Sequence, residues 1–244
     1  QKIYPPYVDF GTALYSALGT MAALRERDAT GKGCKVETSL FGTAISFNNA
    51  ALLEQATMDL NRVGTGNRGQ VGAPIDAFKT LDGWILIQVI GQPLFERWAQ
   101  LMGESSWLDT EKYNTDEKRG NNRDEICERT QTWCKQRSTE DCLKLLAEAR
   151  IPSGPILSPE EAIRDKHVND MNFLKPLDYP GLKKPAPVSP LPIKYSRGDI
   201  SNKTSEEAAP FNRPPKLGEH TDFILKKLGY NSDKIKDLRA KGVI

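Results

Sequence analysis

The sequence predicts an α/β protein that combines part of a large domain with an inserted small α+β domain. Two observations carry this prediction. A helix, a strand and a helix follow one another over residues 1–60, and a β-hairpin signal followed by amphipathic helices fills residues 75–165. One strand is too few for a self-sufficient parallel sheet. We therefore expect the large domain to be incomplete within this chain, with the missing strands supplied by another segment or another chain.

The first helix is expected to begin close to Asp9 and to end at Gly31. Its apolar side chains recur at helical spacing, which predicts one buried face; they are Leu14, Ala17, Leu18, Met21 and Ala22. Asp9 lies where free N–H groups and the helix dipole favour an anion. On position alone, a structural N-cap is the simplest role for this carboxylate.

A short strand is predicted next, over Lys35–Leu40, because polar and apolar side chains alternate there. Phe41–Leu60 then has helical periodicity. Residues 61–74 follow as a glycine-rich loop or linker, which we expect to be mobile unless a ligand holds it.

The small domain, residues 75–165, is predicted to open with two strands on either side of Asp82-Gly83, a strong hairpin signal. A helix with Pro93 in its first turn is predicted next, followed by a helix over residues 121–137. A third helix is predicted over residues 139–150, with Ser138 as its N-cap. A fourth is predicted after Ser158, with Pro159 at the first helical position. Residues 166–244 would hold a Pro-rich extended stretch over 174–192 and two closing helices, at about 218–228 and 232–241, that return to the large domain.

Composition excludes several functional classes. Lys and Arg number 34 against 32 Asp and Glu, so no charge excess argues for nucleic acid or for a membrane surface. No apolar run approaches the length that crosses a bilayer. The four cysteines are Cys34, Cys127, Cys134 and Cys142. They contain no C-x-x-C pair and the two histidines are far apart, so we expect reduced thiols and no metal site.

The first residues contain neither an initiator Met nor an apolar signal region, which is typical of a chain picked up in mid-sequence. We expect an intracellular, cytoplasmic protein, with mitochondrial and peroxisomal locations left open. Four cations are candidates for contacts with an anionic ligand, a solvated surface being the alternative for each; they are Lys32, Lys35, Arg62 and Arg68.

Three ordered blocks carry a resemblance to a known family. They are Asp9 with Ala23-Leu24-Arg25 and Thr30-Gly31-Lys32-Gly33, then Asp82-Gly83-Trp84, and finally Pro215-Lys216-Leu217-Gly218-Glu219-His220-Thr221-Asp222 with Leu228-Gly229-Tyr230. Together they resemble the family III CoA-transferases, the group of formyl-CoA and carnitine CoA-transferases and their sibling, α-methylacyl-CoA racemase. The chain departs from the family at Ala13, where Gly is usual, and at Cys34, where Gln is frequent; neither departure alters Asp9.

The resemblance implies that Asp9 is the catalytic carboxylate. It also implies that a nucleotide-fold region carrying most of the CoA contacts precedes Asp9, so this chain corresponds to the C-terminal part of such an enzyme. The large domain would then be an incomplete nucleotide-fold-like domain, with its CoA-binding residues mostly upstream of Gln1. The loop glycines and amide that would shield the reacting acyl group are Gly64, Gly66, Asn67 and Gly69.

Three functions follow as alternatives. The first is transfer of CoA between carboxylic acids through an aspartyl anhydride and an aspartyl–CoA thioester, with acyl-CoA and an acceptor acid as substrates and no tightly bound cofactor. The second is racemisation at the α-carbon of an acyl-CoA, with Asp9 as half of an acid/base pair. The third is a truncated remnant or interaction module without catalysis. The family also implies an interlocked homodimer, and the incomplete sheet predicts association with a second copy or with the missing N-terminal half.

Overall fold

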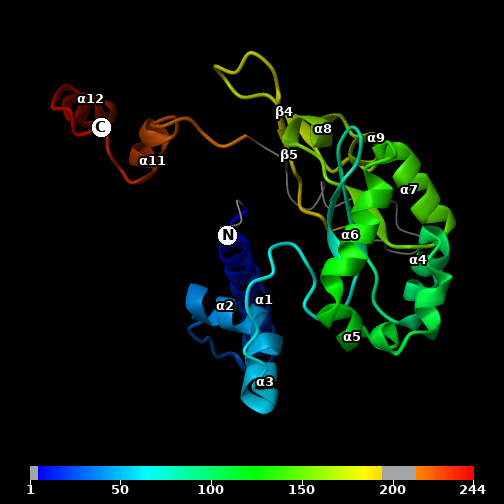
Figure 1. Cartoon of the computed structure of the whole chain (residues 1–244). Helices are drawn as coiled ribbons and strands as arrows, with labels where there is room; N and C mark the ends of the chain where they lie inside the picture. Colours follow the sequence, from blue (N-terminus) through cyan, green and yellow to red (C-terminus); the bar gives the residue numbers. More distant parts are fainter. Residues whose placement is uncertain (1–4, 194–212) are drawn as a thin grey trace, which may run out of the picture. The chain divides into compact units, whose positions relative to one another are not determined.

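The computed structural model describes residues 5–193 and 213–244 and divides the chain into two compact units, Gln1–Ile156 and Leu157–Ile244 (Figure 1). Both units contain helices and short strands, so the mixed helix and strand content that the sequence predicts is confirmed. The boundaries at residues 60, 74 and 165 stay predictions.

Three helices open the first unit: α1 (Tyr7–Thr30), α2 (Leu40–Phe47) and α3 (Asn49–Met58). As predicted, α1 ends at Gly31, whose φ of 73° is left-handed and costs glycine little. Hydroxyl groups join α1 to α2: the Tyr15 and Ser46 side-chain oxygens lie 3.1 Å apart. The helix expected over Phe41–Leu60 is interrupted at Asn48, which ends α2 and precedes α3.

The strand predicted over Lys35–Leu40 is wrong. Residues 32–39 form no strand, and Leu40 is already helical. Ser39 has extended backbone angles, but its hydroxyl accepts a hydrogen bond of 3.0 Å from the Gly42 N–H and so caps α2. An alternating segment forms a strand only where a second strand offers hydrogen-bonding partners, and no such strand lies beside this segment in the described part of the chain.

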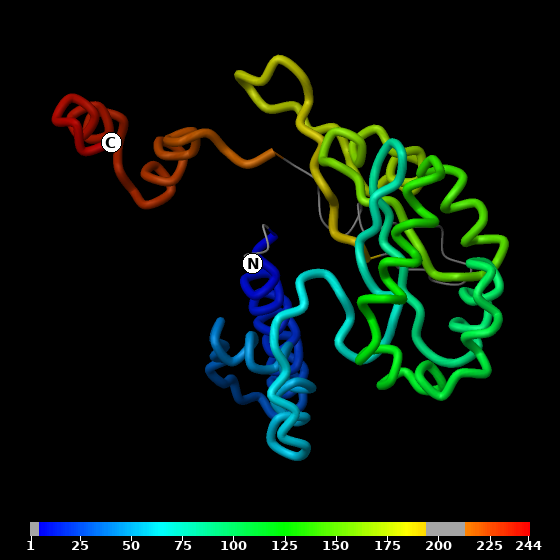
Figure 2. The backbone as a smooth tube through the Cα atoms, viewed as in Figure 1, coloured from blue at the N-terminus to red at the C-terminus, as the bar shows by residue number. Residues whose placement is uncertain are grey.

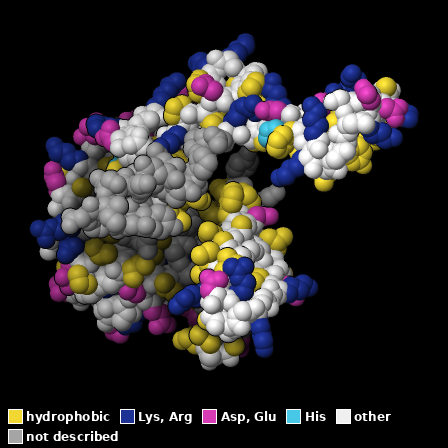
Figure 3. Space-filling view, turned by 180° about the vertical axis from the view of Figure 1, so that it is seen from behind, with side chains coloured by type: hydrophobic (Ala, Val, Ile, Leu, Met, Phe, Trp, Pro, Cys, Tyr) yellow, Lys and Arg dark blue, Asp and Glu magenta, His cyan; other side chains and the backbone are white. Residues whose placement is uncertain are grey.

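The buried face predicted for α1 is also wrong within this chain. Leu14 is 71 % exposed, Leu18 67 % and Met21 64 %. The reason is that α2 packs against the other side of the helix, where Gly11 is the buried residue of α1. Hydrophobic side chains consequently gather on the described surface of this helical part (Figure 3).

The rest of the first unit is an antiparallel sheet covered by helices, and its path is followed in Figure 2. Its strands are β1 (Ile75–Lys79), β2 (Trp84–Gln88) and β3 (Ser153–Pro155), in that order. The hairpin predicted at Asp82-Gly83 is confirmed, with Lys79 opposite Trp84 at its end. The short strand β3 was not predicted; it pairs with β2, placing Gly154 opposite Leu86.

The helices of this part are α4 (Gln92–Met102), α5 (Asp116–Asn121), α6 (Arg123–Cys134) and α7 (Thr139–Glu148), with 3-10 turns at Ser105–Asp109 and Glu111–Tyr113. Pro93 lies in the first turn of α4 and Ser138 caps α7, as predicted. The segment expected to be helical from residue 121 begins instead at Arg123, after α5 ends. Inward side chains of β1, β2 and these helices form one apolar core, which includes Phe78, Ile85, Ile87, Phe95, Trp98, Ile126 and Leu146.

The second unit contains α8 (Pro159–Arg164), α9 (Lys166–Asp170), the paired strands β4 (Lys175–Leu177) and β5 (Ala186–Val188), α11 (Thr221–Lys227) and α12 (Ser232–Ala240). The predicted start of α8 is confirmed: the Ser158 hydroxyl accepts from the Glu161 N–H, and the Glu161 carboxylate accepts from the Ser158 N–H. The two closing helices lie where the sequence predicts them. Their return to the large domain remains a prediction.

None of the helices in the described parts of the chain combines the length and apolar character that crossing a bilayer requires.

Candidate active site

Asp9 lies in the first turn of α1 and is exposed. It is not the N-cap, which corrects the structural role that its position suggested. The N-cap is Pro6, which makes no side-chain cap hydrogen bond, and the helix begins at Tyr7. Asp9 is therefore the third helical residue. It still lies at the positive end of the helix dipole, where unpaired N–H groups favour an anion.

The turn that carries Asp9 is held against α2. The Thr12 hydroxyl lies 2.7 Å from the Val8 carbonyl oxygen and 2.9 Å from the Thr43 hydroxyl. Gly11, which precedes Thr12, is in close contact with Phe47 and Thr43 of α2. Within residues 5–193 and 213–244, no hydrogen bond or ion pair engages the Asp9 carboxylate. The backbone below this carboxylate is therefore fixed while its oxygens stay open to solvent.

A groove of about 450 Å³ runs along α1 and α2 beyond this turn. Apolar surface forms most of its lining, and the hydroxyl groups of Tyr15, Thr38, Thr43 and Ser46 also lie on it. The sequence does not reveal this groove, because Tyr15 and Ser46, whose hydroxyl groups meet on its lining, are 31 residues apart.

The glycine-rich loop has an exposed tip and a packed base. Gly64, Gly66 and Asn67 are exposed, and Gly66 has a left-handed φ of 71°. Gly69 is half-buried, and a Cβ built on it would lie 2.8 Å from the Ile75 Cβ. The Gly69 N–H donates a hydrogen bond of 2.9 Å to the Ile75 carbonyl oxygen. The prediction of a loop is confirmed, but its base is bound to the start of β1.

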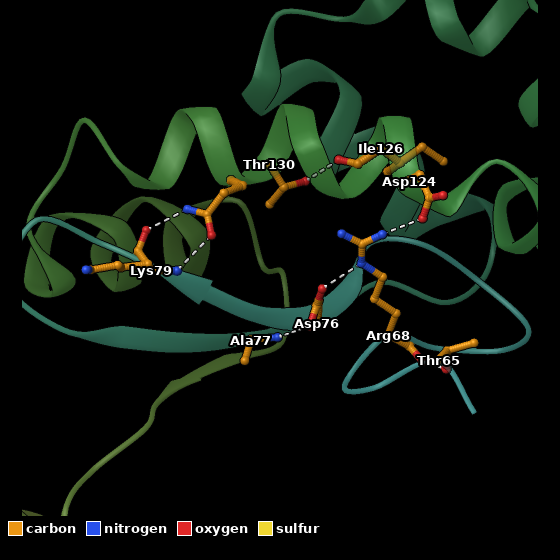
Figure 4. A network of polar contacts seen from close by, with 9 residues as sticks. Thr65, Arg68, Asp76, Ala77, Lys79, Asp124, Ile126 and Thr130 are labelled. Carbon is orange, nitrogen blue, oxygen red and sulfur yellow. Dashed lines mark hydrogen bonds and ion pairs between the residues drawn. The ribbon is translucent and has the colours of Figure 1, made fainter. Parts of the chain in front are cut away.

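Arg68 makes the main polar contact between this loop and the small sheet (Figure 4). Its Nε donates to Asp76 Oδ2 at 3.2 Å, and its Nη1 donates to Asp124 of α6. Partial burial by itself lowers the pKa of Arg68. The hydrogen bond to Asp76 and the neighbouring negative charges outweigh burial, so the pKa of Arg68 is raised above its ordinary value. From the sequence, Arg68 is expected only as a surface cation or an anion ligand. No local pattern links it to Asp124, 56 residues away.

The structure does not join the two predicted parts of the site. Across the described residues, no hydrogen bond or ion pair connects Asp9 with residues 61–74.

No group of three or more His, Cys, Asp or Glu side chains in the described ranges could hold a metal ion. Three of the four thiols are buried, and burial, with the charge of Asp76, raises the pKa of Cys127 to about 11.

The sequence pattern of CoA-transferase family III matches residues 1–221. The chain belongs to this family.

Curated relatives include several named CoA-transferases. The chain is 29% identical over 258 residues to a formyl-CoA:oxalate CoA-transferase of Rhodopseudomonas palustris, covering 96% of this chain and 58% of that protein. It is 28% identical over 239 residues to the human succinyl-CoA:glutarate CoA-transferase, covering 97% and 52%. The chain thus spans little more than half the length of these relatives.

Solved structures show the same fold. A CaiB/BaiF family protein from Brucella suis superposes with a TM-score of 0.68 at 24% identity, over 93% of this chain and 57% of that one. A hypothetical protein from Mycobacterium tuberculosis, Rv3272, superposes with a TM-score of 0.69 at 19% identity, over 91% of this chain and 56% of the other.

Proposed function

We propose that this chain carries the nucleophile of an enzyme that transfers CoA between carboxylic acids, and that the nucleophile is Asp9. One observation supports this above the others: Asp9 is an exposed carboxylate in the first turn of α1, on backbone held against α2, in a member of CoA-transferase family III. The relatives named above transfer CoA between acids such as formate, oxalate, succinate and glutarate.

The proposed reaction has two halves. An Asp9 oxygen attacks the thioester carbonyl of the acyl-CoA, forming a C–O bond and breaking the C–S bond, so that CoA leaves as a thiolate and a mixed anhydride remains. The thiolate then attacks the aspartyl carbonyl and releases the donor acid, leaving an aspartyl–CoA thioester. The acceptor carboxylate attacks this thioester and displaces the thiolate to give a second anhydride. The thiolate attacks the acceptor acyl group, which yields the new acyl-CoA and frees Asp9.

The first turn of α1 suits this chemistry. Each addition places negative charge on a carbonyl oxygen, and unpaired N–H groups at a helix start can stabilise such charge. The nucleophile is already a carboxylate, so no separate base is needed. An exposed anhydride would be hydrolysed, and exclusion of water by the glycine-rich loop, with its Gly64–Asn67 tip, completes the proposal.

CoA itself is proposed to be held mostly by a protein segment outside this chain. No described part of the chain has the strand, glycine-rich turn and helix that cradle phosphates. A homodimer, or association with the segment that completes the large domain, belongs to the same proposal, as does a cytoplasmic location.

The proposal is tested by trapping the intermediate. The native protein is incubated with succinyl-CoA or formyl-CoA without acceptor, quenched and digested, and the peptide containing Asp9 is examined by mass spectrometry. We expect a CoA adduct on Asp9, and none in the Asp9→Asn variant. An adduct on another residue would move the nucleophile elsewhere. Exchange of the α-proton with solvent deuterium, without any adduct, would favour racemase chemistry instead.

A further inference from the structure

The glycine-rich segment is not one free loop, because its first residues are bound to α3. The Asn61 N–H donates a hydrogen bond of 2.8 Å to the Gln55 side-chain oxygen. Arg62 forms an ion pair of 2.6 Å with Glu54. Asp59 and Asn61 both have left-handed backbone angles, which turn the chain sharply after α3. Residues 59–62 are therefore held against the end of α3.

The following residues, 63–70, close on themselves. The side-chain amide of Gln70 donates a hydrogen bond of 2.6 Å to the Val63 carbonyl oxygen, and its nitrogen lies 3.3 Å from the Thr65 hydroxyl. The Thr65 hydroxyl in turn donates 2.6 Å to the Arg68 carbonyl oxygen. These bonds tie both ends of the turn together, so Gly64–Asn67 is presented as the tip of a closed turn.

Arg68 attaches this closed turn to two elements of the small domain at once (Figure 4). Asp76 belongs to β1 and its side chain is only 16 % exposed, whereas Asp124 on α6 is 83 % exposed. The inner contact is the better shielded from solvent, and shielded charge-assisted hydrogen bonds are the stronger ones. Gly120 of α5 lies against the same segment: a Cβ there would stand 2.8 Å from the Gln70 carbonyl oxygen.

We propose that Arg68 is a positioning residue of the shielding loop. By bridging Asp76 and Asp124 it holds the closed turn 63–70, the flap, against β1 and α6. The inference rests on the proposed function for its catalytic consequence, but the flap itself can be tested separately.

The competing role for Arg68 is direct contact with a CoA phosphate. Two carboxylates already occupy its guanidinium, so a phosphate would have to displace one of them. If Arg68 bound a phosphate, its loss would raise KM for acyl-CoA. If Arg68 only positions the flap, its loss should leave that KM close to the native value.

The first experiment measures hydrogen exchange in the native protein over residues 63–70. In Arg68→Gln both carboxylate contacts are lost. We expect exchange at the Gly69 N–H, which is hydrogen-bonded to the Ile75 carbonyl oxygen, to rise about tenfold or more, since hydrogen bonds to charged groups have net values that correspond to such a factor. Arg68→Lys keeps the charge but not the bidentate reach, and should give a smaller rise. Arg97→Gln changes a half-buried arginine on α4 that donates to the Arg150 carbonyl oxygen; it is the matched control and should leave the segment unchanged.

A double-mutant cycle identifies the contact. If Arg68 acts through Asp124, then Asp124→Asn should raise exchange by itself and add less than its full effect to Arg68→Gln. Unchanged exchange over 63–70 in Arg68→Gln would overturn the proposal, whatever the enzyme does.

The second experiment measures acceptor-independent hydrolysis of acyl-CoA as a fraction of total turnover. A loosened flap admits water, so Arg68→Gln should raise this fraction severalfold while KM for acyl-CoA stays close to that of the native protein. A higher KM with an unchanged hydrolysis fraction would overturn the proposal in favour of phosphate contact. If the native protein transfers no CoA at all, the proposed function fails, and the exchange experiment alone decides the role of Arg68.

Discussion

Gly11 of α1 lies so close to Phe47 of α2 that a Cβ at position 11 would stand 2.4 Å from Phe47 Cζ. Nothing larger than hydrogen fits there while the ring keeps its position. This contact is two residues beyond Asp9, and the Thr12 and Thr43 hydroxyls meet beside it at 2.9 Å. The orientation of the turn that carries Asp9 therefore depends on the close approach of α1 and α2.

Gly11→Ala should separate these helices. Overpacking of this kind costs about 1–3 kcal/mol, reduced here by the ability of the half-exposed Phe47 ring to move. We expect a lower unfolding midpoint in denaturant and, in the native protein, a lower turnover number. Gly33→Ala is the control, because no atom lies within 4 Å of its added Cβ. Equal effects of the two substitutions would show that the Gly11 contact does not support the site.

Asp9→Asn should abolish transfer while leaving the fold nearly unchanged. Asn is neutral and a far weaker nucleophile, whereas the loss of one charge in a helical first turn costs only about 0.3–1 kcal/mol. Circular dichroism and the unfolding midpoint check the fold, and CoA transfer by the native protein checks activity. Near-normal turnover in this variant would remove Asp9 from the mechanism.

Asp82 should give the small domain a stability that depends on pH. Its Oδ1 accepts hydrogen bonds from the Thr139 N–H at 2.7 Å and the Thr139 hydroxyl at 2.8 Å, which lower its pKa from the ordinary 3.8. Because the pKa of Asp82 is lowered in the folded state, the ionised carboxylate stabilises the fold at pH values above its ordinary pKa. This stabilisation is lost as the pH falls through the lowered pKa of the folded state.

The comparison is between the native chain and Asp82→Asn, by denaturant unfolding from about pH 6 to about pH 3. The native chain should be the more stable at the upper end, and the difference should shrink towards the lower end. Asp109→Asn changes an exposed carboxylate and serves as the control. A difference that does not vary with pH would contradict the assigned role of Asp82.

The thiols should differ in reactivity. Cys34 is exposed, whereas Cys127, Cys134 and Cys142 are buried, and burial also raises the pKa of Cys134. A thiol-specific reagent at neutral pH should modify Cys34 in the folded chain and all four after denaturation, as counted by mass spectrometry. Labelling of Cys127 as fast as Cys34 would show that the core of the small domain opens readily. Cys34→Ser is the control for the folded-state signal.

The correct sequence predictions share a physical feature: each depends on residues within one turn of the chain. Gly31 ends α1 because of its left-handed backbone, and Ser138 and Ser158 start helices by accepting hydrogen bonds three residues on. The hairpin at Asp82-Gly83 is equally local. Such signals operate whatever the rest of the protein does.

The errors concern contacts that the local sequence cannot specify. Lys35–Leu40 alternates correctly, but a strand also needs a partner, and the described chain offers none. β3 is three residues long, too short for periodicity to register. The two carboxylates that bind Arg68 lie 8 and 56 residues along the chain, so the role of Arg68 emerges only from the fold.

The exposed face of α1 predicts association. Phe10 is 62 % exposed, and with Leu14 and Leu18 it forms a continuous apolar strip along the helix. A strip of this kind in water is an interaction surface or an aggregation liability. We expect the chain to self-associate, or to bind the segment that completes the large domain, and sedimentation at micromolar concentration should show a species heavier than one chain. Leu14→Gln with Leu18→Gln should shift the distribution towards the monomer, whereas Leu81→Gln, which changes an exposed leucine of the hairpin turn, should not. A stable monomer of the unaltered chain, with no companion polypeptide, would contradict the prediction, because the strip would then be tolerated in solvent without a partner.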